Sequence, residues 1–418
     1  MKKERSLTSI LPLCLVLLID GMGLGLFLPI LNAILIEPSA KFLPFDTSIL
    51  MRDFCYGLTI GIFMICWFFG AAVLGDLSDN VGRKKSLMIC LLGSFFGYLL
   101  SAVAIVFQSF WLLIISRIIA GFTAGSQPIA QASIIDISTE EHKARNISLI
   151  LLSISIGFVL GPICGGILSN KNLVSWFSFQ TPMYFASSLS LINAFLLYFT
   201  FNETFTKRHN QLKIKWHHAI NIFIQAFNHK SIKKYSLVLL VMIFGWSNYF
   251  SFISLFLLQT YHYSAMKNSL FLATMGLGFS VGCGFFVDFC TKRYNFERIV
   301  EVGLLATSVF VLITLISSSQ WVAWGSAFLI GITLSVAYSV LLTIFSNQVG
   351  DDEQGWVMGV TGSVMALCFG VTSIFTGLVA HLGAVLPMLL AVIGLALSAI
   401  LLWFLESKAD FKPNKHRN

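Results

Sequence analysis

The sequence predicts an all-α membrane protein in which twelve transmembrane helices form two pseudo-symmetric six-helix bundles. Three observations support this fold class. The 418 residues are 56% hydrophobic and only 11% charged, whereas soluble proteins carry about 25% charged residues. Apolar runs long enough to cross a bilayer recur along the whole chain. A charged pattern in the first half also returns, in weaker form, in the second half.

A membrane-spanning helix needs roughly 20 predominantly apolar residues. The predicted spans are residues 8–34, 54–76, 86–107, 110–135, 146–168, 180–201, 236–260, 268–288, 299–317, 321–346, 356–379 and 382–405. The apolar run behind the charged N-terminus extends from about Leu7 to Ile36 and contains Asp20. This run is too long for the apolar core of a signal peptide, so we expect a retained first helix.

Lysine and arginine are distributed unequally between the two sides of this topology. If the N-terminus is cytoplasmic, 22 of the 27 basic residues lie in cytoplasmic segments, and Arg117 lies inside a span. The four on the outer side are Lys41, Arg52, Lys171 and Lys267. Because positive charge accumulates on the cytoplasmic side, we expect both termini in the cytoplasm. The net charge of +8 then reflects topology, and no nucleic-acid partner is expected.

The two halves carry related residues at the same register. A shift of 209 residues pairs Gly75 with Gly284, Asp79 with Asp288 and Arg83 with Lys292. Such a repeat predicts two related bundles with a substrate site between them. We expect an N-terminal bundle, a basic linker with an amphipathic helix, a C-terminal bundle and a cytoplasmic tail, over residues 1–203, 204–235, 236–405 and 406–418. The linker helix is expected to lie along the inner leaflet while it joins the halves.

The first copy of this pattern is the more specific one. Asp79 and Arg83 are four residues apart and can pair on one helix face. The spacing Gly-x3-Asp-x2-Gly-Arg-Lys, from Gly75 through Gly82, resembles the signature between helices 2 and 3 of the major facilitator superfamily. The resemblance implies the fold of those alternating-access transporters and a conformational latch in which Asp136 approaches Arg83. An ordinary basic loop, with Asp136 as a helix cap, is the alternative.

The fourth span holds an arginine on a stripe of small residues. Arg117, Gly121 and Gly125 recur at about one helical turn and share a face. A charge inside an apolar span is costly, so Arg117 must find carbonyls, an acid or water. Arg-x3-Gly-x3-Gly is similar to the fourth-helix signature of the same superfamily, which implies that Arg117 faces the cavity and takes part in proton coupling. Bracing of a neighbouring helix by hydrogen bonds is the alternative.

Asp20 is the acid that falls clearly in the middle of a predicted span. Burial disfavours an ionised carboxylate, whereas a nearby Arg117 would favour it. A group whose ionisation depends on access to water or substrate suits a proton-coupled cycle. Asp-x2-Gly-x-Gly-Leu-x2-Pro resembles the first helix of drug and tetracycline exporters, which implies that Asp20 carries the proton. A static ion pair or a hydrogen bond at a helix bend is the alternative. Tetracycline exporters carry further intramembrane acids, and the absence of such acids from the predicted spans argues against a tetracycline substrate.

The fifth span is unusually rich in helix-disfavouring residues. They are Gly157, Gly161, Pro162, Gly165 and Gly166. Their cost is tolerated inside a membrane where neighbouring helices repair the backbone or where a hinge is useful. The spacing resembles the signature that accompanies exporters working by antiport, although uptake members show similar glycine patterns.

Further side chains are candidates for the substrate cavity. They are Gln127, Gln131, Trp246, Asn248, Tyr249, Tyr338 and Met365. Their aromatic and amide groups suit a bulky, partly apolar ligand, and each can equally serve packing. The eight cysteines show no metal-ligand spacing, so no metal or cofactor is expected and a proton gradient would supply the energy.

We therefore expect a secondary active transporter that exports a small amphipathic molecule by proton antiport and alternating access. The alternative is a siderophore, organic-anion or metabolite transporter of the same fold, working in export or uptake. An enzyme is not expected, because no nucleophile–base pair is visible and the histidines avoid mid-span positions. The resemblance implies a monomer that spans a bacterial inner membrane, with a small-molecule substrate and the lipid bilayer as its partners.

Overall fold

The computed structural model describes residues 7–37, 41–138, 140–203, 217–350 and 353–410, which are mostly helical and include no strand. The first bundle contains α1 (Leu7–Leu31) with η1 (Asn32–Ile36), α2 (Ile49–Val81), α3 (Arg83–Val106), α4 (Phe110–Thr123), α5 (Ser126–Ile137), α6 (Glu140–Leu168) and α7 (Thr181–Thr200). The second bundle contains α9 (Lys233–Tyr261), α10 (Ala265–Val281) with η3 (Gly282–Phe286) and α11 (Val287–Thr291), α12 (Phe296–Ile316), α13 (Gln320–Asn347), α14 (Gln354–Val379) with η5 (Ala380–Leu382), and α15 (Val385–Asp410). Helix α8 (His217–Asn228) lies between the two bundles in sequence.

Most of these helices are long and apolar enough to cross a membrane. Eleven stretches of the described chain meet that condition, and Leu152–Leu168 within α6 is a shorter apolar stretch. Because α6 as a whole has 29 residues, the predicted count of twelve is consistent with the structure. The predicted all-helical membrane fold is confirmed.

Besides the first span, which passes into π-helix at Asn32 near its end, two predicted spans are not continuous α-helices. The fourth is divided into α4 and α5, with a break at Ala124 and Gly125. The break lies beside α2, because a Cβ added at Gly125 would lie 2.6 Å from the carbonyl carbon of Gly70. The eighth passes from α-helix to π-helix at Gly282. Sequence periodicity could not reveal either feature, because both depend on a neighbouring helix or on local winding.

The two bundles share one packing pattern. In the first, α2 packs on α4 and α3 packs on both α4 and α7. In the second, α10 packs on α13 and α12 packs on both α13 and α15, which are the corresponding helices. Gly121 of α4 lies against the backbone of Phe63 in α2, and Gly331 of α13 lies against the backbone of Met275 in α10. The internal repeat therefore extends from sequence to packing.

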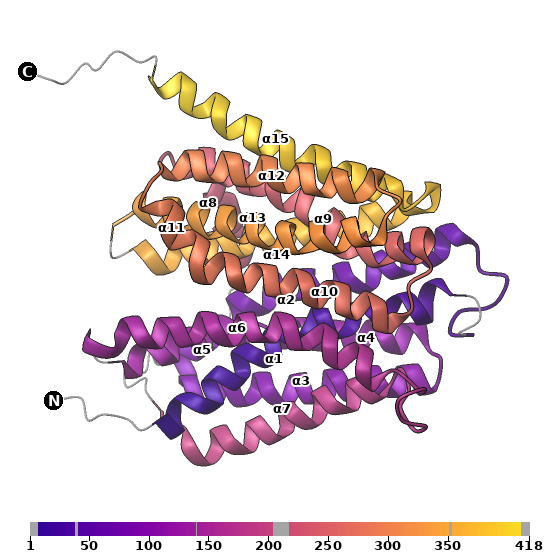
Figure 1. Ribbon diagram of the computed structural model, residues 1–418. Coiled ribbons are helices and arrows are strands. Elements are labelled where there is room, and N and C mark those ends of the chain that lie inside the picture. The colour runs from indigo at the N-terminus through magenta and orange to yellow at the C-terminus, as the bar shows by residue number, and fades with distance from the viewer. Residues whose placement is uncertain (1–6, 38–40, 139, 204–216, 351–352, 411–418) are drawn as a thin grey trace, which may run out of the picture.

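The bundles meet along two equivalent helix pairs, α2 with α14 and α6 with α10. Helix α1 begins and α15 ends at the same end of the molecule (Figure 1). We call this end the base and the opposite end the tip. The contact of Gly57 and Gly61 in α2 with Gly370 and Gly377 in α14 is the tip seam, because it lies in the tip halves of both helices. An added Cβ at Gly57 would lie 2.9 Å from the Cα of Gly377.

Helix α8 packs against both bundles rather than lying free on the surface. It contacts α2 on one side and α9 and α14 on the other. Ala219 and Ala226 are buried, and the ring of Phe223 lies 6.4 Å from that of Phe68. The expected position along a lipid surface is thus replaced by contacts with protein on this face, while Ile220 remains exposed. Residues 204–216, which include the predicted lipid-facing lysines, lie outside the described residues.

Candidate functional site

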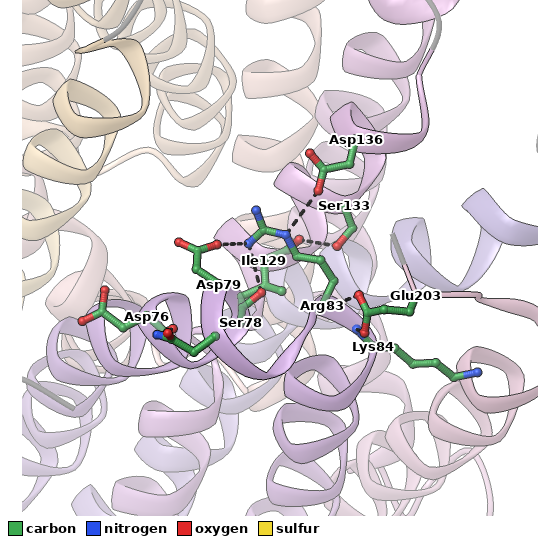
Figure 2. A network of polar contacts seen from close by, with 10 residues as sticks. Asp76, Ser78, Asp79, Arg83, Lys84, Ile129, Ser133, Asp136 and Glu203 are labelled. Carbon is green, nitrogen blue, oxygen red and sulfur yellow. Dashed lines mark hydrogen bonds and ion pairs between the residues drawn. The ribbon is translucent and has the colours of Figure 1, made fainter. Parts of the chain in front are cut away.

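The predicted latch residues meet at the base of the first bundle (Figure 2). Arg83, at the start of α3, places Nη1 2.8 Å from Asp79 Oδ1 and Nε 3.3 Å from Asp136 Oδ2. Its Nη1 also donates to Ser78 Oγ at 3.0 Å. The guanidinium therefore joins the end of α2, the start of α3 and the end of α5. Arg83 is 14% exposed in its side chain, so water screens these contacts less than at an open surface.

Gly82 and Glu203 complete this network in a way that sequence analysis missed. Gly82 has a φ of 112°, which permits the sharp turn between α2 and α3. The Glu203 carboxylate occupies the space beside it and accepts the backbone N–H groups of Arg83 and Lys84 at 2.9 and 3.2 Å. An acid at a helix N-terminus is favoured by the helix dipole. Glu203 is 120 residues away from Arg83, so local sequence gave no signal of this contact.

Gly75 does not have the close helix contact that its place in the pattern suggested. An added Cβ would meet nothing within 4 Å in the described structure, and the same is true at Gly284 of the second copy. The Asp288–Lys292 pair of that copy, at 2.6 Å, is about 70% exposed at both side chains. The second copy is therefore a simple surface pair, and no third partner of that pair appears within the described ranges.

Asp20 lies inside the first bundle at the break between α4 and α5. Ser126, the first residue of α5, donates its hydroxyl to Asp20 Oδ2 at 2.7 Å. No salt bridge of Asp20 occurs among the residues described here. The break in the fourth span thus places the neutral Ser126 hydroxyl beside the half-buried Asp20 carboxylate.

Arg117 is held apart from Asp20 by an aromatic environment. Its guanidinium carbon lies 3.9 Å from the ring centroid of Phe27 and 5.9 Å from that of Tyr98. Nη2 donates to Ser101 Oγ at 2.7 Å, and Nε has no hydrogen-bond partner in the described chain. Cation–π contact stabilises such a desolvated cation. The bracing contacts are therefore made to α1 and α3, and an ion pair with Asp20 is absent from the described contacts.

The glycines of α6 allow it to pack on the backbone of α1. Added Cβ atoms at Gly157 and Gly161 would lie 3.0 Å from Gly21 Cα and 2.9 Å from Met22 Cα. Gly165 approaches Leu26 in the same way, and Pro162 lies against Gly25. Gly166 instead faces Ser269 of α10 in the second bundle. The motif thus joins Asp20's own helix to the contact between the bundles.

The predicted cavity residues divide into two groups. Asn248 is fully buried, donates to the Phe244 carbonyl oxygen and accepts from Thr376, so its amide is used within the second bundle. Tyr249 is also fully buried and stacks on Trp246.

The other candidates retain some exposure. Tyr338 donates its hydroxyl to Met365 Sδ at 3.5 Å, which brings α13 and α14 together. Gln127, Gln131, Trp246, Tyr338 and Met365 are each half-buried. All seven stay candidates for contact with a ligand; the Asn248 amide is already used, whereas the Tyr249 hydroxyl has no hydrogen-bond partner among the described residues.

An acid within the second membrane helix was missed. The predicted span began at residue 54, whereas α2 begins at Ile49 with Ser48 as its N-cap. Asp53 therefore lies inside α2 and is 1% exposed. Asp53 lies one residue before the predicted span of residues 54–76, so the predicted absence of a second mid-span acid, and the argument against a tetracycline substrate that uses it, stay predictions.

Two related bundles of long apolar helices, with a half-buried acid and a buried arginine inside the first, define a multi-pass membrane protein. The model of the Major Facilitator Superfamily matches residues 13–371. The chain therefore belongs to this superfamily.

Individual relatives agree with this assignment at low identity. The tetracycline resistance protein, class C, of Escherichia coli is 29% identical over 205 residues, or 49% of this chain and 48% of the relative. The chain thus matches about half the length of that relative. The quinolone resistance protein NorA of Staphylococcus aureus is 25% identical over 402 residues and covers 93% of both chains.

Solved structures share the fold. The human organic anion transporter MFSD10 has a TM-score of 0.70 and 20% identity, covering 94% of this chain and 99% of its own. A D-xylose–proton symporter has a TM-score of 0.74 and 14% identity, covering 94% of this chain and 97% of its own.

Proposed function

We propose that the protein exports a small amphipathic molecule in exchange for protons across a bacterial inner membrane, as a monomer whose base faces the cytoplasm. The observation that carries this proposal is the environment of Asp20. Its carboxylate lies within the first bundle and is bonded to the neutral Ser126 hydroxyl. An ionised carboxylate is costly in such surroundings, so a change in access to water would change its proton occupancy.

The direction of transport is supported by the packing of α6 and by the relatives. Gly157, Gly161 and Gly165 bring α6 against the helix that carries Asp20, and Gly166 meets the second bundle. A protonation change at Asp20 therefore has a short path to the contact between bundles. One relative that matches about half of the chain is named as a tetracycline resistance protein, and one that matches most of it is named as a quinolone resistance protein. These names favour export over uptake.

The ionic network at the base has a different role in this proposal. Arg83 joins three helices of one bundle through Asp79, Asp136 and Ser78. Contacts confined to one bundle do not have to break when two bundles rock. The turn at Gly82 allows α2 and α3 to meet in this network. The network would act as a latch that holds the ends of α2, α3 and α5 together at the base of the first bundle while the tip seam opens and closes. Arg117 would support the coupling site by holding α1 and α3 in place.

The substrate would contact the half-buried side chains of the second bundle and of α5. Trp246, Tyr338 and Met365 offer aromatic and thioether surface, while Gln127 and Gln131 offer amide groups. This mixture suits a drug, an endogenous metabolite or a siderophore with both polar and apolar parts.

Transport by purified protein in liposomes tests the proposal. Drugs and iron chelators are screened under an imposed pH gradient, and the wild type should move its substrate against a concentration gradient in the direction opposite to protons. Asp20→Asn should abolish this uphill movement and leave expression unchanged. Asp46→Asn, at an exposed acid of the α1–α2 connection, is the matched control and should transport normally.

Two outcomes would contradict the proposal. If Asp20→Asn still concentrates substrate, the coupling group lies elsewhere. If substrate and protons move in the same direction, the protein is a symporter and the exporter assignment is wrong.

A further inference from the structure

The tip seam carries a buried acid, Asp53, at the contact between the two bundles. Asp53 lies in α2 one helical turn from Tyr56, whose hydroxyl donates to the Ser251 carbonyl oxygen of α9 at 2.7 Å. An added Cβ at Gly377 of α14 would lie 2.8 Å from the Asp53 carbonyl oxygen. Both contacts join the first bundle to the second. Asp53 therefore lies at the contact that must break when the tip opens.

The Asp53 carboxylate has no hydrogen-bond partner for Oδ2 in the described structure, although its side chain is almost fully buried. The adjacent Arg52 does not compensate, because its three nitrogens donate to the carbonyl oxygens of Leu35, Pro44 and Thr47 at 3.2, 2.8 and 3.3 Å. An unpaired ionised carboxylate is expensive to bury, and the neutral carboxyl is much less so.

A pocket of about 370 Å³ connects this acid to the tip. Its lining comes from both bundles and consists of Ile36, Phe45, Thr47, Ile49, Arg52, Asp53 and Gln259. Gln259 of α9 accepts the Ala384 N–H at 3.2 Å, so its amide oxygen is already used. The pocket lies on the tip side of Asp53 and provides no cation to neutralise the carboxylate other than the engaged Arg52.

Other titratable groups near Asp53 are few. On α2 they are Arg52 and Tyr56, both held by the bonds above. On η5, His381 interacts electrostatically with Asp53, and its Nδ1–H donates to the Leu378 carbonyl oxygen at 2.8 Å. The neighbouring α9 and η1 contribute the uncharged Gln259 and Ile36 to the pocket. His381 is thus the competing source of any pH response.

We propose that Asp53 is a proton-binding site, loaded from water on the tip side, that controls closure of the tip seam. The carboxylate takes one proton when the seam closes, as in this structure, and returns it to the same side when the seam opens and water reaches Asp53. The site requires the two bundles to rock, as in the proposed function, but it does not require Asp20. By linkage, one proton released on opening makes the open-to-closed ratio rise about tenfold per pH unit while the site titrates.

Hydrogen exchange of the full-length protein in nanodiscs tests this inference. Exchange is followed in residues 49–61 and 370–379, corrected for the intrinsic effect of pH, between pH 5 and 9. The wild type should show a rise in seam exchange with pH that approaches about tenfold per unit. Asp53→Asn, which keeps the size of the side chain without the charge, should give slow exchange at every pH. Asp46→Asn should behave as the wild type.

Two further variants separate the possible causes. Asp20→Asn should lose uphill transport but keep the pH response of the seam, so the two proposals can fail independently. His381→Gln should also keep the response. A wild-type seam that ignores pH, a response that survives in Asp53→Asn, or a response lost in His381→Gln would each overturn the assignment to Asp53. A wild-type seam that ignores pH overturns the proposal even if a variant does not fold.

Discussion

The tip seam and the base of the first bundle are held together by opposite kinds of contact. At the tip, glycines of α2 and α14 bring the backbones of different bundles together, with an added Cβ at Gly61 only 2.6 Å from the Gly370 carbonyl oxygen. At the base, Arg83 joins helices of one bundle through charged side chains. The dispersion attraction between closely packed apolar surfaces is favourable at contact distance, but it is lost when the surfaces move slightly apart.

This difference indicates which contacts belong to the moving parts and which to the rigid parts. A seam made mostly of backbone approach can separate as a unit once the Tyr56–Ser251 hydrogen bond across it breaks. An ionic network within one bundle keeps its geometry while that bundle rotates. The structure thus has a contact that can break at the tip and a fixed contact at the base, as alternating access requires. Substitutions at each region can test this reading.

The largest effect is expected at the tip seam. Gly61→Val should force α2 away from α14 and cost about 1–3 kcal/mol of packing. The seam should then stay open, so hydrogen exchange in residues 370–379 should rise and transport should fall. Gly75→Ala is the matched control, because an added Cβ there meets nothing within 4 Å. Equal exchange in the two variants would show that backbone approach does not hold the seam.

A smaller effect is expected from substitutions in the two related ion pairs, Asp79–Arg83 and Asp288–Lys292. Arg83→Ala removes contacts with Asp79, Asp136 and Ser78, and because Asp79 is 59% and Asp136 35% exposed, each ion pair contributes about 0.2–1 kcal/mol. Lys292→Ala removes one exposed pair with Asp288, which contributes about 0–1 kcal/mol.

Thermal unfolding in nanodiscs and initial transport rates measure both variants. Arg83→Ala should lower the unfolding midpoint and reduce transport severalfold, whereas Lys292→Ala should resemble the wild type. A similar loss in both would mean that the second copy has partners beyond those of the described chain, and that the bundles are more alike at the base than their contacts indicate.

Sequence was sufficient for the features that depend on local pattern. Apolar runs predicted the membrane helices, and the spacing of Asp79 and Arg83 predicted their ion pair, although the pair spans the turn at Gly82 between α2 and α3 instead of one helix face. The repeat of Gly121 at Gly331 corresponds to the same helix contact in both bundles. Each of these follows from helical periodicity or from a fixed offset along the chain.

Features that depend on distant segments were not predictable. The break after Thr123, which brings Ser126 to Asp20, lies where α2 approaches Gly125. Asp53 was missed because its span was assigned from hydropathy and began at residue 54, whereas the helix begins at Ile49, directly after its Ser48 cap. Glycine spacing at residue 75 suggested close contact, but no neighbour approaches it in the described structure. Spacing shows which residues share a face and cannot show what covers that face.

The smallest effect is expected from substitution of Glu203, which tests how much a negative charge at the N-terminus of α3 contributes to the stability of the base. Its carboxylate accepts the backbone N–H groups of Arg83 and Lys84, whereas α12 of the second bundle begins at Phe296 without a side-chain cap. Glu203→Gln keeps one acceptor oxygen and removes the charge, so it should cost about 0.3–1 kcal/mol. Hydrogen exchange in the first turn of α3 should rise modestly, while the tip seam should exchange as in the wild type. If the seam also loosens, the base and tip are coupled through α2, and the separation of fixed and breakable contacts is incorrect.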